Sequence, residues 1–199
     1  MSSFCLWMSG LPCSGKTTIV RKLTETIPNL AILDGDELRE WLSPKNFSKE
    51  ARDEHQFKVA HLAKLLLQHN VPMGVSTISP YKANRAKARE IIGDDTKFFE
   101  VYVNASLAQC EERDVKGMYA KARSGEIKGF TGIDDPYEAP ENADLVLDTE
   151  NKSLDESAAE VLEFLKSKNL LYTIHQSRDK TRVEVVLLKS HADLFSLIQ

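Results

Sequence analysis

The sequence has few cysteines, no long apolar run and no excess of positive charge. Its three cysteines, Cys5, Cys13 and Cys110, include no pair at metal-ligand spacing, which predicts reduced thiols in a cytoplasmic protein rather than a disulfide framework. No run reaches the ~18 apolar residues that a membrane span needs, and the short N-terminal stretch lacks the basic lead of a signal peptide. The formal net charge is −4, so the chain lacks the basic surface that DNA or RNA requires. We therefore expect neither a membrane nor a nucleic acid as a partner.

What is present is the composition of one globular domain. The chain has 199 residues, of which 42% are apolar and 28% charged, enough for a substantial core. Apolar runs alternate with segments of helical period, a pattern typical of an α/β protein with a parallel sheet. Strands are expected at Phe4–Met8, Leu30–Leu33, Pro72–Ile78, Phe98–Val103 and Leu145–Leu147.

Helices are expected between these strands. Residues 15–27 and 48–69 have helical character, and the second segment repeats apolar residues at i, i+3, i+4 and i+7. Ser106 with Gln109, and Ser153 with Glu156, are spaced as capping boxes, so each pair predicts a helix start.

Two segments do not fit this alternation. Residues 115–140 are rich in glycine and charge, which predicts a long loop with one short helix, and loops of that length are usually functional. Beyond Lys168 the pattern changes again, so we divide the chain into a main domain, 1–168, and a C-terminal extension of unknown role, 169–199. Within the extension, Val183–Leu188 resembles a strand and Ala192–Ile198 a helix.

The clearest motif lies after the first expected strand. Gly10 to Thr17 reads GLPCSGKT and fits G-x-x-x-x-G-K-[ST] between a strand and a helix. Glycines let successive N–H groups face phosphate oxygens, and the helix N-terminus adds positive charge. In such a cradle Lys16 reaches the β- and γ-phosphates and Thr17 offers its hydroxyl to Mg²⁺. The expected contacts with ATP are Gly10, Leu11, Pro12, Cys13, Ser14, Gly15, Lys16, Thr17 and Thr18.

A second candidate lies at the end of the next expected strand. Asp34 and Asp36 flank Gly35 there, and ligands of open α/β sheets bind at the carboxyl ends of the strands. Phosphoryl transfer needs a carboxylate to hold Mg²⁺ or to accept the acceptor's proton. We assign that role to Asp36 and a turn-shaping role to Asp34. The alternative is that both aspartates cap a helix that begins near Glu37.

Several longer stretches carry a family resemblance. The cradle, LDGDELR, FSKEARDEH, TISPY, EVYVNA and above all residues 113–149 closely resemble adenylyl sulfate kinases. The resemblance implies a P-loop nucleoside triphosphate hydrolase fold, with a five-stranded parallel sheet flanked by helices and a lid loop. It also implies a homodimer and transfer of the γ-phosphoryl group of ATP, with Mg²⁺, to the ribose 3′-hydroxyl of adenylyl sulfate, a step of sulfate assimilation.

The resemblance also assigns residues. Lys16, Asp36 and Ser79 are expected to be catalytic, and Thr17 with Asp36 to hold the metal. Arginine forks suit phosphate and sulfate oxygens, and phenylalanines suit stacking on adenine. The expected acceptor contacts are Asp36, Arg39, Phe47, Arg52, His55, Ile78, Ser79, Lys116, Gly129 and Phe130.

Four residues depart from the family pattern on the acceptor side. Glu37 and His55 stand where relatives have asparagine, and Phe57 and Lys58 replace an arginine pair. A carboxylate facing an anionic acceptor would repel it, so Glu37 is expected to point away or to bind Mg²⁺. We hypothesise that His55 lies in the acceptor pocket and titrates near pH ~6.5.

These departures leave two alternatives open. One is a related kinase that phosphorylates another nucleotide hydroxyl, such as cytidine diphosphoramidate in capsule biosynthesis. The other is a nucleotide-binding regulatory module, which the unexplained residues 169–199 would suit.

Overall fold

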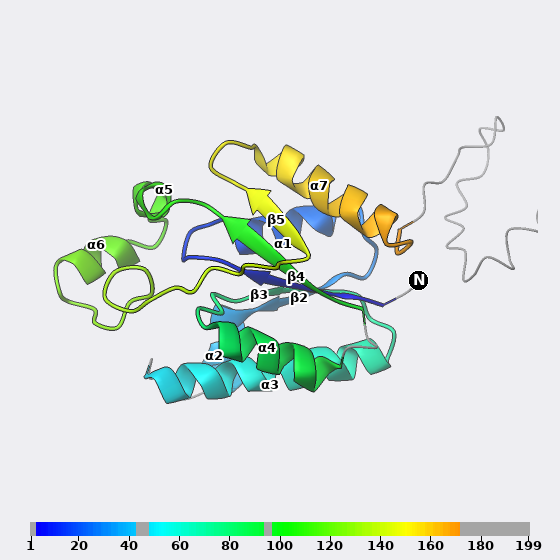
Figure 1. Cartoon of the computed structure of the whole chain (residues 1–199), viewed down its shortest axis with the longest axis horizontal. Helices are drawn as coiled ribbons and strands as arrows, with labels where there is room; N and C mark the ends of the chain where they lie inside the picture. Colours follow the sequence, from blue (N-terminus) through cyan, green and yellow to red (C-terminus); the bar gives the residue numbers. More distant parts are fainter. Residues whose placement is uncertain (1–2, 43–47, 94–96, 172–199) are drawn as a thin grey trace, which may run out of the picture.

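The computed structural model describes residues 3–42, 48–93 and 97–171. They form a five-stranded, wholly parallel sheet with helices on both faces, which confirms the predicted fold class (Figure 1). Phe47 and the two elements expected in the C-terminal extension lie outside the described residues. No helix in the described ranges is both long and apolar enough to cross a membrane.

The strands keep the predicted places within one or two residues at their starts. They are β1 (Cys5–Ser9), β2 (Ala31–Asp34), β3 (Met73–Ser76), β4 (Phe98–Asn104) and β5 (Leu145–Asp148), in the spatial order β2-β3-β1-β4-β5. All five residues of β1 are buried, because the strand lies at the centre of the sheet and both its faces are covered, as expected for a parallel sheet.

The helices include one that the sequence did not suggest. They are α1 (Lys16–Leu23), α2 (Gly35–Leu42), α3 (Lys49–Gln68), α4 (Lys82–Ile92), α5 (Leu107–Arg113), α6 (Met118–Arg123) and α7 (Leu154–Ser167). No element was predicted where α4 lies. α6 is the single short helix expected within residues 115–140.

Both predicted helix starts are confirmed, but only one of the two predicted capping boxes is complete. Ser153 and Glu156 form a complete capping box at α7. At α5 only half of the box exists: Ser106 Oγ accepts from the Gln109 amide at 3.2 Å. The Ser106 amide donates to Glu150 at 2.9 Å instead of to the side chain of Gln109. The acid that completes the cap therefore comes from the loop after β5.

Two apolar layers hold the sheet between its helices. One lies under α1 and α7 and the other under α3 and α4. Gly74 on β3 shows how closely α1 packs, because a Cβ there would come within 2.5 Å of a Val20 methyl group. Burying these apolar faces is the main stabilising contribution to the fold.

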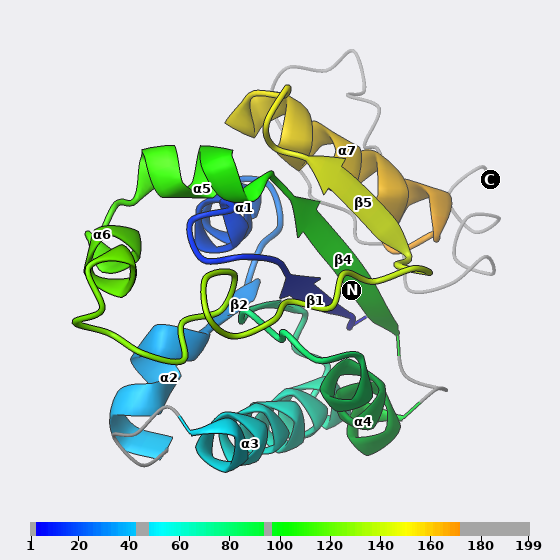
Figure 2. The same ribbon diagram turned by 60° about the vertical axis from the view of Figure 1, so that its left-hand side comes forward.

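Between β4 and β5 the chain leaves the sheet and returns. It forms α5 and α6, and then residues 130–144, which we name the strap, run back across the ends of the central strands (Figure 2). The strap is anchored by a hydrogen bond of 2.8 Å that the backbone amide of Glu138 donates to the Pro80 carbonyl. The long loop predicted from the sequence therefore lies over the carboxyl edge of the sheet.

Candidate active site

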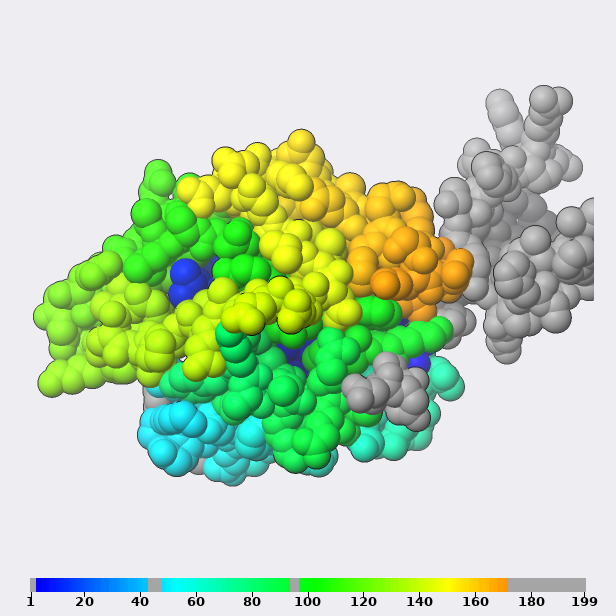
Figure 3. All heavy atoms as spheres, viewed as in Figure 1, coloured from blue at the N-terminus to red at the C-terminus, as the bar shows by residue number. Residues whose placement is uncertain are grey.

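The cradle, residues 10–17, requires glycine at two positions. Gly10 has φ 151°, and a Cβ there would lie 2.5 Å from the Val103 carbonyl oxygen. Gly15 precedes α1 with φ 106°, and no side chain caps this helix. The first N–H groups of α1 are therefore left for a ligand. In the space-filling view, blue atoms of the early chain lie at the bottom of a hollow bordered by green and yellow-green segments (Figure 3).

Lys16 is folded back onto the cradle. Its ammonium donates to the carbonyls of Gly10 at 2.9 Å and Leu11 at 2.7 Å, and to Ser14 Oγ at 3.3 Å. The side chain is buried, and burial lowers the pKa of Lys16 to about 8. In this position the lysine fixes the shape of the cradle, and a triphosphate would offer it a stronger partner than these neutral carbonyls.

Two residues that the sequence analysis missed hold the cradle from outside. Arg113 lies 3.4 Å from each of the carbonyl oxygens of Cys13 and Ser14, and Thr149 Oγ1 donates to the Ser14 carbonyl at 2.8 Å. Because a trans peptide places its N–H opposite its C=O, a Ser14 carbonyl held outside turns the Gly15 amide toward the inside. The arginine that opens the most family-specific stretch was the signal for this contact.

Asp34 has a larger part in the site than predicted. Its Oδ1 accepts from the amides of Asp36 at 2.9 Å and Glu37 at 3.4 Å, which confirms the turn-shaping role and caps α2. Its Oδ2 accepts from Thr17 Oγ1 at 2.7 Å, and Ser76 Oγ lies 3.0 Å from the same hydroxyl. Three hard oxygens thus meet beside the cradle, a set that suits Mg²⁺ with phosphate as a further ligand.

Asp36 is an exposed residue in the first turn of α2. Its Oδ2 forms an ion pair of 2.7 Å with Lys116, which lies just before α6 in the long loop 115–140. This hydrogen bond is the main cause that raises the pKa of Lys116. Asp36 and Lys116 are 80 residues apart in sequence, so the fold brings together two residues predicted to contact the acceptor.

Arg52 on α3 faces the strap. Its guanidinium donates to Thr131 at 3.1 Å and forms an ion pair of 2.9 Å with Asp135. Tyr81 donates to the same carboxylate at 3.0 Å. Arg52 Nε is buried and has no hydrogen-bond partner among the described residues. A buried donor of this kind is costly unless it is satisfied, which favours an anionic ligand here.

Ser79 does not have the environment of a catalytic hydroxyl. It is 1% exposed. Its Oγ accepts from the Trp7 indole at 3.0 Å, lies 2.6 Å from Thr77 Oγ1 and accepts from Gln56. These contacts hold the hydroxyl inside the protein and fix the turn after β3. They do not favour the catalytic role of Ser79, which stays a prediction.

Ile78 contributes through its backbone. Its carbonyl accepts from the Gly10 amide at 3.2 Å. The turn 77–80 therefore contacts the cradle directly, and this backbone hydrogen bond connects the predicted acceptor side with the predicted ATP side.

The hypothesis that His55 titrates near pH 6.5 is wrong. The ring is 3% exposed and its Nε2 lies 2.9 Å from the Gly35 carbonyl oxygen. Burial, followed by the charge of Arg39, lowers the pKa of His55 to about 4. The imidazole is therefore neutral over the whole range in which the acceptor would be assayed. Arg39 itself is half-buried, and burial lowers its pKa.

Gly129 and Phe130 form the turn that enters the strap. Gly129 has φ 67°, and both amides donate to Asp134, at 2.7 Å and 2.6 Å. The Phe130 ring packs edge-on against Tyr119 with ring centroids 5.0 Å apart. The Phe130 ring thus packs against the small apolar cluster around Tyr119. Stacking of Phe130 on an adenine remains a prediction.

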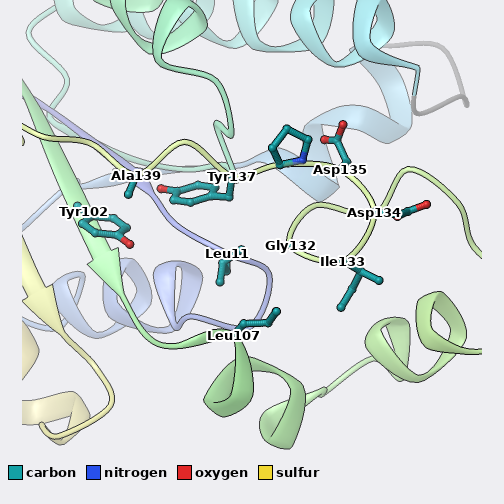
Figure 4. Close-up of a pocket in the computed structure, with 10 residues that line it drawn as sticks. Leu11, Tyr102, Leu107, Gly132, Ile133, Asp134, Asp135, Tyr137 and Ala139 are labelled. Atoms are coloured by element: carbon teal, nitrogen blue, oxygen red, sulfur yellow. The ribbon is translucent and has the colours of Figure 1, made fainter.

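A hollow of about 610 Å³ lies beside the cradle (Figure 4). The residues around it come from the cradle, β4, the start of α5 and the strap. Most are apolar or tyrosine residues, such as Leu11, Leu107 and Tyr137, and Asp134 and Asp135 are the charged ones. None of the groups predicted to do chemistry lines it, so the candidate active site is the neighbouring edge around Lys16 and Asp36.

The fold and the cradle define the class of protein. A shikimate kinase from Aquifex aeolicus superposes with a TM-score of 0.52 at 18% identity, covering 84% of this chain and 99% of its own. A likeness at so low an identity shows only a shared fold. The parallel sheet and the Gly10–Thr17 cradle define the chain as a P-loop nucleotide-binding protein.

The particular family follows from closer relatives. The family model for adenylylsulphate kinase matches residues 2–148, and the chain belongs to that family. An adenylyl-sulfate kinase from Halothermothrix orenii is 47% identical over 171 residues, covering 83% of this chain and 91% of its own length. The chain is thus an ATP-dependent phosphotransferase that acts on a hydroxyl group.

A solved structure shows the same relationship. An APS kinase from Mycobacterium tuberculosis, in complex with AMPPNP and APS, has a TM-score of 0.78 and 42% identity. The match covers 83% of this chain and 98% of that one. A probable adenylyl-sulfate kinase from Synechocystis is 50% identical over 161 residues, which are 78% of this chain and 89% of that protein.

Proposed function

We propose that the chain transfers the γ-phosphoryl group of ATP to the ribose 3′-hydroxyl of adenylyl sulfate, giving ADP and 3′-phosphoadenylyl sulfate. The observation that carries the proposal is the 42% identity, over 83% of this chain, to a kinase solved with AMPPNP and APS. The site supports it, because the cradle motif is complete and the Arg52 guanidinium lies beside the strap, paired with Asp135 and Thr131.

The residues divide the reaction between them. Cradle amides and Lys16 hold the β- and γ-phosphates, which fixes the phosphorus that is attacked. Asp36 accepts the proton of the 3′-hydroxyl as its oxygen bonds to that phosphorus and the bond to ADP breaks. Lys116 and the Arg52 fork neutralise the charges of the acceptor. Thr17, Asp34 and Asp36 would hold Mg²⁺, which would supply charge neutralisation at the phosphates.

The departure at Glu37 is compatible with this acceptor. Glu37 is exposed and forms an ion pair of 3.3 Å with Arg21 on α1. Its carboxylate is thus directed to the neighbouring helix, as expected for a residue that must not repel an anion. Lys58 pairs with Glu54 at 2.7 Å on its own helix.

The test is turnover by the purified protein with Mg-ATP and a panel of acceptors, following ADP. Adenylyl sulfate should be phosphorylated, and Lys16→Ala should abolish the reaction. Turnover with a cytidine diphosphoramidate alone would instead establish the second kinase activity. Tight ATP binding without turnover of any acceptor would point to the regulatory module.

Assembly and location belong to the same proposal. The family resemblance supports a homodimer, and the three free cysteines support a reducing, cytoplasmic compartment. Light scattering on the eluting protein should give twice the mass of the 199-residue chain. A mass equal to one chain would remove the dimer from the proposal without affecting the reaction.

A further inference from the structure

Arg85 is a buried arginine that the proposed reaction does not use. It lies in the first turn of α4 and is 3% exposed. Its guanidinium contacts three separate segments. One terminal nitrogen donates to the Ser79 carbonyl and the other to the Glu138 carbonyl, each at 2.7 Å. Its Nε lies 2.7 Å from a Glu100 carboxylate oxygen on β4.

The first two segments meet where the strap crosses the turn 77–80. The Glu138 amide donates to the Pro80 carbonyl at 2.8 Å, and its carbonyl accepts from Arg85. The main chain of one strap residue is therefore held from both sides. On the turn, Ser79 has φ 48°, a left-handed conformation that is uncommon for a residue with a side chain. The arginine bond to its carbonyl helps to stabilise that conformation.

The geometry of guanidinium explains why arginine is needed. Its planar fork presents donors in three fixed directions at once, whereas the lysine ammonium is a point charge on a flexible stem. The pairing with Glu100 offsets the cost of burying the charge. The Tyr137 ring, 6.0 Å from the guanidinium carbon, covers it from the strap side.

The strap connects this junction to the acceptor side. Asp135, three residues before Glu138, holds Arg52 at 2.9 Å. Movement of the strap at Glu138 would therefore change the placement of Asp135 and of the Arg52 fork. The nucleotide cradle is held mainly by Lys16, Arg113 and Thr149. It meets the turn 77–80 through one backbone hydrogen bond, from the Gly10 amide to the Ile78 carbonyl at 3.2 Å.

We propose that Arg85 is a positioning residue for acceptor binding, which holds the strap against the turn after β3 and so orients Arg52. The inference rests on the proposed function for the identity of the acceptor. Loss of the Arg85 fork should disturb the acceptor site more than the ATP site, because the cradle keeps its bonds from Lys16, Arg113 and Thr149.

The test compares Arg85→Lys with Arg89→Lys. Arg89 lies one turn further along α4, pairs with Asp144 at 2.7 Å and packs on the Phe98 ring, but does not touch the turn. Arg85→Lys should raise KM for the acceptor by about tenfold, the equivalent of one charge-assisted hydrogen bond. KM for ATP should stay within about twofold, and Arg89→Lys should change neither constant by more than that.

A purely structural role predicts another result. If Arg85→Lys lowers kcat in proportion to the folded fraction and leaves both KM values unchanged, the proposal is overturned. An equal rise of both KM values also overturns it. Arg85→Gln, which removes the charge and shortens the fork, serves as the second variant if the lysine variant folds poorly.

Amide hydrogen exchange measures how firmly the strap is held against the turn 77–80, and it needs no acceptor. The Glu138 amide should exchange at least about tenfold faster in the Arg85 variants than in the wild type and the Arg89→Lys control. Unchanged exchange in both Arg85 variants contradicts the proposal. If the wild type does not phosphorylate adenylyl sulfate, the proposed function fails. The exchange experiment, and KM for whichever acceptor is used, still decide the role of Arg85.

Discussion

At the scale of single residues, burial gives Lys16 a charge that depends on pH in an accessible range. Its pKa is lowered to about 8 in the free protein, and a bound triphosphate stabilises the ammonium and raises that pKa. ATP binding should therefore take up a proton above pH ~8, and ATP affinity should fall by up to about tenfold per pH unit there.

Calorimetry in two buffers of different ionisation enthalpy measures this uptake directly. At about pH 9 the apparent binding enthalpy should differ between the buffers, and at about pH 7 it should not. Lys22→Ala is the matched control, because Lys22 is on the same helix but pairs with Glu25 and Asp155. Buffer-independent enthalpies at the higher pH would show that Lys16 is already fully charged before ATP binds.

Mutation of Asp34, the last residue of β2, and of Asp36, in the first turn of α2, should have different kinetic effects. Asp36→Asn should lower kcat by about 10²-fold or more, because it removes the proton acceptor, and should leave ATP affinity nearly unchanged. Asp34→Asn loses a charged partner of Thr17, so it should raise the Mg²⁺ concentration needed for half-maximal rate. Steady-state kinetics over a magnesium series measures both effects. A near-normal kcat for Asp36→Asn would remove Asp36 from the mechanism.

His55 makes stability depend on pH. Its pKa is about 4 in the folded protein, against 6.5 for an unperturbed histidine, so the unfolded chain binds more protons between these values. Stability is then fully present above pH 6.5 and falls as the pH drops toward 4, by a loss of the order of 3 kcal/mol. Urea titrations across this range test it.

His55→Asn supplies the comparison for that experiment. The variant should show a shallower dependence of unfolding free energy on pH than the wild type. The wild-type KM for the acceptor should not follow a group titrating near pH 6.5, because His55 stays neutral there. A KM for the acceptor that rises through that range would instead support a histidine that titrates near pH 6.5 in the acceptor pocket.

At the scale of elements, the sequence predicted what depends on local patterns. The five strands, the cradle and the Ser153 capping box each follow from neighbouring residues. Helix α4 was missed because its buried face is half polar: Asn84 and Arg85 lie there beside Ala88 and Ile92. A hydrophobic period cannot reveal a face on which polar side chains are buried to bind distant segments.

The same distinction applies to the site. The cradle was predictable because its residues are contiguous, whereas Thr17 meets Asp34 across 17 residues and Arg113 meets Cys13 across 100. The mistaken titration of His55 and the untested catalytic role of Ser79 have one feature in common. Both depended on burial and partners that only the folded chain supplies.

The packing of α1 on the sheet gives a prediction about one strand. Gly74→Ala places a methyl group 2.5 Å from a Val20 methyl, closer than van der Waals contact. We expect a loss of about 1–3 kcal/mol in unfolding free energy. Val20→Ala makes room, so the double variant should recover part of that loss, and a double-mutant cycle by chemical denaturation measures the coupling. Strictly additive losses would show that the two side chains do not meet.

At the scale of the whole molecule, residues 3–42, 48–93 and 97–171 include the cradle and all predicted acceptor contacts except Phe47. A chain ending at residue 171 should therefore keep kcat and both KM values within about twofold and its melting temperature within a few degrees. Parallel kinetics and thermal unfolding of the full and shortened chains test the division at 168–169. Loss of turnover in a shortened chain that still folds would assign the extension a part in catalysis.

The bond between the Trp7 indole and Ser79 Oγ also makes the turn after β3 optically visible. Trp7 is fully buried, and the second tryptophan of the chain, Trp41, is 67% exposed. Trp41→Phe would leave a single fluorophore whose N–H reports on the hydroxyl at that turn. Emission shifts in such a variant would follow the arrival of each nucleotide in real time, with no coupled enzymes or radiolabel.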